Sequence, residues 1–193
     1  MQAIIAMLRG VNVGGHNPIS MQALRAFCGS LDLQGAQTYV QSGNVVFRSK
    51  ERNLSALAKR FEDAFEKTFG FRAPLVLRTA AEMRTVIANS PFATRKEIEP
   101  GKFHVIFLTE ELNPEARKQL EAAKVGLEEI KPGSREVYVY YPTGMGKSKL
   151  PPLLDRILKK AGTARNWNSV TALLEMAEGI ESMGADSEGG KNI

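Results

Sequence analysis

The sequence predicts an α+β protein in which one pattern of strands and helices, βαββαβ, occurs twice. The first observation is a series of short apolar or β-branched runs of strand length. The second is a set of segments between them with apolar residues at helical spacing, and the third is that both recur in the same order in residues 1–79 and 102–166. We expect a connecting helix and linker over 80–101, a final helix over 167–179 and a mobile tail over 180–193.

The first half begins with the apolar run 3–8, which predicts a central strand. Ser20 can cap the first helix, and Asn53 can cap a longer helix that ends near Gly70. Between these helices, Ser42 to Asn44 form a tight hairpin signal. The expected elements are strands at 3–8, 38–41, 45–47 and 75–77, and helices at 21–31 and 54–69.

The second half repeats this order after a short connecting helix, for which Thr79 and Glu82 have capping-box spacing. Asn113 followed by Pro114 predicts a helix start, and Gly162 is the expected end of the next helix. The expected elements are strands at 102–109, 127–130, 136–141 and 163–165, a helix from 114 to about 123, a helix around 153–158, and a final helix that includes Val170, Leu173, Leu174 and Ala177.

Two βαββαβ units correspond to tandem ferredoxin-like halves with the strand order 4-1-3-2. Because roughly 80 residues bury little surface alone, we expect the halves to pack together. In this topology the loop after the first strand emerges beside the central hairpin, whereas the loop after the third strand emerges beside the end of the fourth. In the first half, the loop after the first strand and the hairpin are rich in glycine, asparagine and basic residues. In the second half, the loop after the third strand and the end of the fourth strand are rich in them. Each half therefore has one polar edge.

The two polar edges hold most of the loops that are rich in glycine, asparagine and basic residues, which favours a phosphate- or carboxylate-bearing ligand. A turn-only role for these glycines remains open. The segment TGMGKSKL follows a strand and opens a helix, so its free N–H groups, with Lys147 and Lys149, could hold a phosphate or carboxylate. It is not a Walker A loop, and RGVNVGG is not a dinucleotide fingerprint. The candidate ligand-binding residues are Arg9, Asn12, Gly14, Gly15, Gln41, Ser42 and Asn44 in the first half, and Gly146, Lys147, Ser148, Lys149, Arg165 and Asn166 in the second.

Three other functions remain open. A cofactor-independent enzyme would use His16 or Lys147 for proton transfer at the same loops. A nucleic-acid-binding module would use Tyr138 and Tyr140, which share a strand face that Phe107 could join, together with the basic edges. We favour burial of that face between the halves, and a packing role for Trp167. A protein-interaction scaffold is the fourth possibility.

Composition narrows the classes of function. Hydrophobic residues make up 43% and charged residues 24% of the 193 residues, which excludes disorder throughout. One cysteine and two histidines cannot form an internal disulfide or a Cys/His zinc site, so we expect no metal and no cofactor. Cys28 and His104 are expected to be core or sheet residues, and the Glu pairs 110/111 and 128/129 lie at turns or strand ends.

Hydropathy and charge bear on location and partners. There is no apolar run of membrane-spanning length and no secretory signal pattern, so we expect a cytoplasmic protein without a membrane partner. Residues 1–162 carry a formal charge of +8 and residues 163–193 carry −3. The basic body favours an anionic partner. The oligomeric state is open.

Four blocks resemble the signature blocks of a bacterial family known as domain of unknown function 1697. They are MLRGVNVGGHNPISM, TYVQSGNVVF, GMGKSKL and TARNWNSVTAL, and the resemblance covers residues 1 to about 178. It implies a soluble bacterial α+β protein built from ferredoxin-like halves, with no assigned reaction, cofactor or substrate. Where members of this family often have a basic residue in the glycine loop, this chain has His16.

Overall fold

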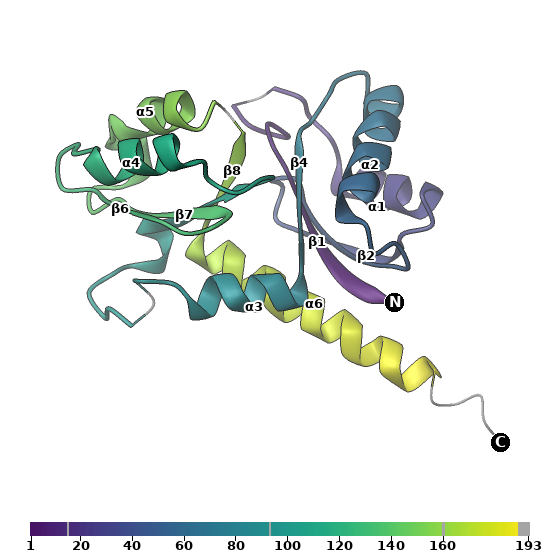
Figure 1. Cartoon of the computed structure of the whole chain (residues 1–193). Helices are drawn as coiled ribbons and strands as arrows, with labels where there is room; N and C mark the ends of the chain where they lie inside the picture. The colour runs from purple at the N-terminus through teal and green to yellow at the C-terminus, as the bar shows by residue number, and fades with distance from the viewer. Residues whose placement is uncertain (15, 93, 160, 189–193) are drawn as a thin grey trace. The chain divides into compact units, whose positions relative to one another are not determined.

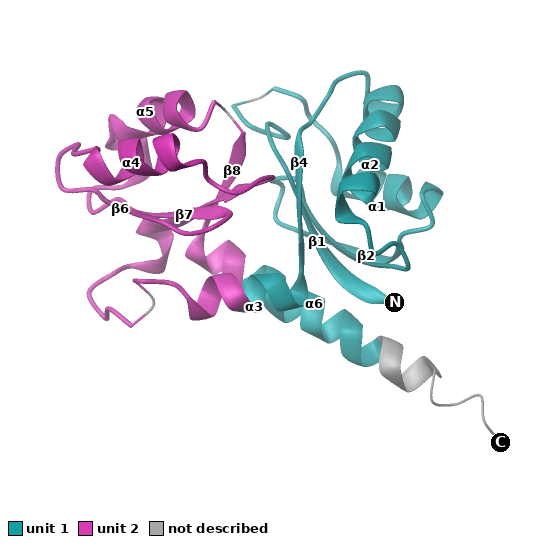
Figure 2. Ribbon diagram, in the orientation of Figure 1, with its two compact units in different colours: residues 1–84, 172–193 teal, residues 85–171 magenta. Residues whose placement is uncertain are grey.

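The computed structural model of the chain describes residues 1–14, 16–92, 94–159 and 161–188 (Figure 1). It is an α+β structure with two four-stranded antiparallel sheets. The chain divides into two compact units, which Figure 2 shows in different colours. Unit 1 comprises Met1–Arg84 and Ala172–Ile193, and unit 2 comprises Thr85–Thr171. The helices α3 and α6 each have residues in both units.

In unit 1, helices α1 and α2 cover one face of the first sheet (Figure 1). The core between them is aromatic: the ring of Phe27 lies 5.0 Å from that of Phe61 and 5.6 Å from that of Phe65, both edge to face. The elements are β1 (Gln2–Leu8), α1 (Met21–Ser30), β2 (Gln34–Tyr39), β3 (Asn44–Ser49), α2 (Leu54–Phe69), β4 (Leu75–Thr79) and α3 (Ala80–Ala88).

The predicted helix caps of unit 1 are confirmed. Ser20 Oγ accepts a hydrogen bond from the Ala23 amide at 3.0 Å, and Asn53 caps α2 in the same way. Thr79 and Glu82 form the expected capping box, because each side chain accepts a hydrogen bond from the other residue's amide, at 3.1 and 2.8 Å. These caps fix where each helix begins relative to the strand before it.

In unit 2, helices α4 and α5 cover one face of the second sheet (Figure 1). Its core on that face is mainly aliphatic, built around Leu120, Leu150, Leu154 and Val139, and it includes the buried Tyr141. The elements are η1 (Pro100–Lys102, a 3₁₀ turn), β5 (Phe103–Leu108), α4 (Pro114–Ala122), β6 (Glu129–Pro132), β7 (Glu136–Tyr140), η2 (Met145–Lys147, a 3₁₀ turn), α5 (Leu150–Ile157), β8 (Gly162–Asn166) and α6 (Trp167–Glu188).

The two units share one plan. The sheets have the orders β2-β3-β1-β4 and β6-β7-β5-β8, which is the same arrangement of first, second, third and fourth strands. In both, the fourth strand continues directly into a helix. Arg78 and Arg165 occupy matching positions, since Arg78 pairs with Ile5 and Arg165 with Val105. Both are buried, and each guanidinium donates to the carbonyl of the preceding residue at 2.8 Å.

Two sequence predictions about helix ends are corrected. Helix α6 continues to Glu188 through part of the segment expected to be a mobile tail; Ile180 is buried, and the Ala3 amide donates to Glu181. The rest of that tail, 189–193, lies outside the described residues. Gly162 does not end α5, which ends at Ile157, but opens β8. A side chain there would collide with β5, because a Cβ would lie 2.7 Å from Ile106 Cγ2.

Both faces of each sheet hold buried residues. On the face of the first sheet away from α1 and α2, Ile5, Met7 and Val46 are fully buried. On the corresponding face of the second sheet, Phe103, Val105 and Phe107 are buried. Over the residues that the structure describes, no helix is long and apolar enough to cross a bilayer.

Candidate functional site

In unit 1, the loop after β1 and the β2–β3 hairpin lie against each other, as the topology predicted. The Leu8 amide donates to the Gly43 carbonyl at 2.9 Å. Gly43 has φ +69°, and a Cβ there would lie 3.1 Å from Leu8 Cβ and 3.2 Å from Val11 Cβ. Only glycine therefore satisfies both the backbone conformation and this close approach.

Most polar groups of this loop are used to hold it together. Asn12 Nδ2 donates to the Ile19 carbonyl at 2.9 Å, and Asn12 Oδ1 accepts from the Ile19 amide at 2.7 Å. Asn17 Nδ2 donates to the Gly10 carbonyl at 3.1 Å. Asn12 and Asn17 both have positive φ, a conformation that asparagine tolerates better than most residues. The side-chain amide of Asn12 thus closes the loop.

The hairpin is held in the same manner. Asn44 is fully buried, and its side chain donates to the Tyr39 carbonyl at 3.2 Å and to Ser42 Oγ at 2.8 Å. Val40 has φ +46°, which is a strained conformation for a β-branched residue. Its side chain is 53% exposed.

The remaining candidate residues at the edge of unit 1 differ in their solvent exposure. His16, Gln41 and Gly14 are exposed, and Arg9 is half-buried. Gly15 lies outside the described residues. The exposed apolar side chain of Val13, 60% accessible, belongs to the same loop.

In unit 2, the loop between β7 and α5 does not form the helix N-terminus expected of TGMGKSKL. Helix α5 begins at Leu150, and the two residues that follow are Pro151 and Pro152, which have no N–H groups. The Leu150 amide donates to Ser148 Oγ at 3.0 Å. The backbone donors that would bind an anion at this helix start are therefore missing or already bonded.

Ser148 ties this loop to the loop before β6. Its hydroxyl is hydrogen-bonded to the carboxylate of Glu128. Gly126, with φ +64°, lies so close to this carboxylate that a Cβ would be 2.7 Å from Glu128 Oε2. The loops 123–128 and 141–149 are therefore neighbours. The sequence predicted only that Glu128 lies at a turn or strand end, and nothing local indicated that its side chain contacts Ser148.

The edge formed by these two loops presents cations and apolar side chains to solvent. Lys124, Lys147 and Lys149 are exposed, as is Gly146. Within the described part of the chain, no hydrogen bond or ion pair holds any of the three ammonium groups. Leu127 is 74% exposed and Met145 42% exposed. We call Lys124, Leu127, Met145, Lys147 and Lys149 the lysine–apolar edge.

Arg165 and Asn166 do not lie beside Ser148. They belong to β8, whereas Glu128, the partner of Ser148, precedes β6 at the opposite edge of the sheet, about 14 Å away at ordinary strand spacing. Arg165 is buried and donates to Thr163 Oγ1 at 2.7 Å, and burial lowers its pKa to about 10. Asn166 Oδ1 accepts from the Ser169 amide and caps the start of α6.

The strand face that carries Tyr138 and Tyr140 is largely buried. Tyr138 is 2% exposed and its hydroxyl donates to the Val86 carbonyl at 2.7 Å; burial raises its pKa. Phe103 stacks on Trp167 with ring centroids 4.5 Å apart. Tyr140 is half-buried, 6.0 Å from the guanidinium of Arg95. Tyr138 is thus not accessible for base stacking, and Phe103 and Phe107 on the same strand face are buried as well.

Two other candidates carry little chemistry. Cys28 is fully buried in the core of unit 1, where desolvation raises the pKa of its thiol to about 12.

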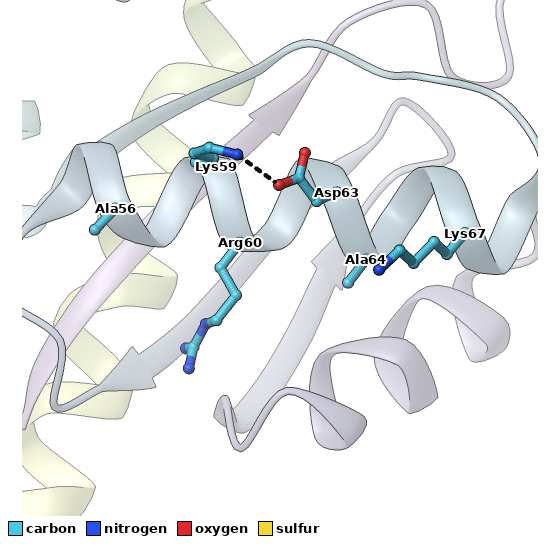
Figure 3. Close-up of a pocket in the computed structure, with 6 residues that line it drawn as sticks. All are labelled: Ala56, Lys59, Arg60, Asp63, Ala64 and Lys67. Atoms are coloured by element: carbon cyan, nitrogen blue, oxygen red, sulfur yellow. Dashed lines mark hydrogen bonds and ion pairs between the residues drawn. The ribbon is translucent and has the colours of Figure 1, made fainter.

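An open groove runs along the outer face of α2 (Figure 3), and its lining consists of Ala56, Lys59, Arg60, Asp63, Ala64 and Lys67. Lys59 in this groove is paired with Asp63 at 2.9 Å. In the described residues, no group of acidic, histidine or cysteine side chains has the arrangement of a metal site.

The family described as "Protein of unknown function (DUF1697)" matches residues 1–138, and the chain belongs to this family. The match includes the glycine loop and the hairpin of unit 1; the blocks GMGKSKL and TARNWNSVTAL lie beyond it. A similar solved structure is that of the conserved bacterial protein SP0830 from Streptococcus pneumoniae. It is 21% identical, with a TM-score of 0.74 over 92% of this chain and 99% of that chain. This likeness shows the fold. No curated protein matches the chain.

Proposed function

We propose that this protein binds a small phosphate- or carboxylate-bearing ligand at the loop edge of unit 2, through Lys147 and Lys149. The observation that carries the proposal is the pair of exposed ammonium groups, two residues apart, with which no carboxylate of the described chain forms an ion pair. Charged donors make the stronger hydrogen bonds to phosphate and carboxylate oxygens. Lysine binds such groups as a point charge, so this edge would select for charge more than for shape.

The loop that carries the two lysines is held in place by its own hydrogen bonds. The amides of Lys147 and Ser148 donate to the carbonyls of Gly144 and Met145, at 3.2 and 3.1 Å, and Ser148 is bonded to Glu128 and to the Leu150 amide. A fixed backbone lowers the entropy lost when a ligand binds. We therefore assign Ser148 a positioning role in place of direct contact.

Glu128 sets the electrostatics of the edge. Its carboxylate accepts from Ser148 and repels an incoming anion, so an anion would bind more tightly if this charge were removed. A Glu128→Gln variant keeps a hydrogen-bond acceptor for Ser148 while it removes the charge. It should strengthen binding of inorganic phosphate, by a few-fold at low salt.

The test is isothermal titration of the full chain with inorganic phosphate, acetyl phosphate and nucleotides at low salt. The Lys147→Ala/Lys149→Ala double variant should bind at least about tenfold more weakly, since two charge-assisted contacts are lost. Lys118→Ala removes another exposed lysine, from α4 of the same unit, and should bind as the wild type does. Equal affinity of the wild type and the double variant for every anion would refute the proposal.

We also propose that each unit is a ferredoxin-like half and that the two halves pack together. The shared strand order and the matching arginines on β4 and β8 support the first part. Small-angle scattering of the full chain tests the second, because separated halves would give a larger radius of gyration than one compact body of this length.

A further inference from the structure

We infer that the lysine–apolar edge of unit 2 docks on an anionic lipid surface, so that the anions it binds are lipid headgroups. This inference rests on the proposed function, because it uses the same two lysines and adds Lys124, Leu127 and Met145. The expectation of no membrane partner came from the lack of a spanning segment, and a protein can lie on a membrane surface without one.

The first step is the position of the two exposed apolar side chains. Leu127 precedes Glu128, and Met145 lies three residues before Ser148. Because Ser148 is hydrogen-bonded to Glu128, both apolar side chains lie within three residues of the contact that joins the two loops. Single exposed apolar residues are common on protein surfaces, but here two of them flank one fixed contact.

The second step is the charge around them. Three lysines accompany the apolar pair, and Glu128, whose carboxylate keeps its charge while it accepts from Ser148, offsets only one of them. Lysine has a long aliphatic stem that can lie along apolar surface while its ammonium group stays at the level of the headgroups. Apolar side chains that insert and lysines that stay outside are the combination that binds anionic membranes.

The third step is the choice of occupant. Protein–protein interfaces favour tryptophan, tyrosine and arginine at their centres and are depleted in lysine. Single-stranded nucleic acid needs exposed aromatic side chains, and the tyrosine of this region, Tyr141, is buried. An edge of leucine, methionine and lysine therefore fits a lipid surface better than either of these.

The experiment is co-sedimentation of the full chain with vesicles of phosphatidylcholine alone or of phosphatidylcholine with phosphatidylglycerol. Binding is expected only to the vesicles that contain phosphatidylglycerol, and it should fall as salt is added. Leu127→Ser should weaken it about tenfold, and Lys124→Ala about fivefold. Val13→Ser changes another exposed apolar loop residue, in unit 1, and should leave binding unchanged.

Titration with inorganic phosphate separates this inference from the proposed function. Leu127→Ser should bind free phosphate as the wild type does. If the wild type binds free phosphate but does not sediment with anionic vesicles, the lipid inference is wrong and the proposed function stands. Equal sedimentation of the wild type and Leu127→Ser would also overturn it, as would capture of the chain by an acidic polypeptide such as polyglutamate but not by the vesicles. If the wild type binds neither free phosphate nor anionic vesicles, the proposed function is wrong as well.

Discussion

Units 1 and 2 follow one strand order but lengthen different loops. In unit 1 the loop between the first strand and helix spans 9–20, whereas its counterpart in unit 2 spans only 109–113. The loop between the third strand and the next helix shows the reverse: 50–53 in unit 1 and 141–149 in unit 2. The short loop at each position shows how few residues are needed to connect the strand to the helix. The additional residues of the long loops, 9–20 and 141–149, are therefore available for other roles, and in each unit they contribute to the polar edge.

The two long loops also differ in what they leave open to solvent. In unit 1 the amides of Asn12 and Asn44 are used inside the edge. In unit 2 the internal contacts use Ser148 and Glu128, so Lys147 and Lys149 remain available. A loop rich in asparagine closes on itself, while a loop rich in lysine presents its charges to solvent. This contrast is why we place the anion site in unit 2.

The cores of the two units give the largest effect by which this comparison can be tested. Phe61 belongs to a cluster of edge-to-face and stacked rings in unit 1, and Leu154 to the aliphatic core of unit 2. Phe61→Ala should cost about 3–5 kcal/mol of unfolding free energy, and Leu154→Ala about 2–5 kcal/mol, since Phe truncations generally lie at the upper end. Urea denaturation followed by circular dichroism measures both.

Alkylation of Cys28 adds a readout that belongs to unit 1 alone. The chain has one cysteine, and a thiol whose pKa is raised to about 12 by burial reacts only when the core opens. Phe61→Ala should speed alkylation in the absence of denaturant. If Leu154→Ala speeds it as much as Phe61→Ala does, the two units open together and do not behave as separate bodies.

The joined loop and hairpin of unit 1 give an effect of intermediate size. Gly43 and Gly10 both have positive φ, but only Gly43 has side chains against the position of a Cβ. Gly10→Ala should cost about 1–2 kcal/mol for the left-handed conformation alone, and Gly43→Ala about 1 kcal/mol or more beyond that, because Leu8 and Val11 must move. Urea denaturation of the two variants compares them. Equal losses would mean that the loop does not rest on the hairpin.

Local patterns predicted most of the fold, because caps and glycine turns act over a few residues. Ser20, Asn53 and Asn113 each begin a helix as expected. The edges were harder to predict, because whether a polar side chain is free depends on partners far along the chain. Nothing local shows that Ser148 bonds to Glu128, twenty residues earlier. The two prolines after Leu150 were a local signal against a helix-start anion site, and their meaning depended on where α5 begins.

The smallest expected effect is pH-dependent and contrasts two matching positions. Ile4 in β1 and His104 in β5 each precede the residue that pairs with a buried arginine, so they correspond. Ile4 is fully buried, and His104 is half-buried with its ring 5.4 Å from that of Tyr141. Burial lowers the pKa of His104 below its ordinary value of 6.5. Unit 2 thus has a titratable group where unit 1 has an aliphatic one.

The direction of the pH effect on stability depends on whether the unfolded or the folded chain is protonated first. As the pH falls through 6.5, the unfolded chain takes up a proton at His104 before the folded chain does, so stability decreases from there down to the folded-state pKa. Above that pH range, His104 makes no contribution to the pH dependence of stability. His104→Ile, which introduces the residue found at the matching position of unit 1, should reduce the change of the urea midpoint with pH between about pH 7.5 and pH 5.5. Thr143→Ala, which changes an exposed side chain of the same unit that does not titrate, is the control and should keep the wild-type slope. An unchanged slope in His104→Ile would show that the two positions differ in chemistry but not in their effect on folding.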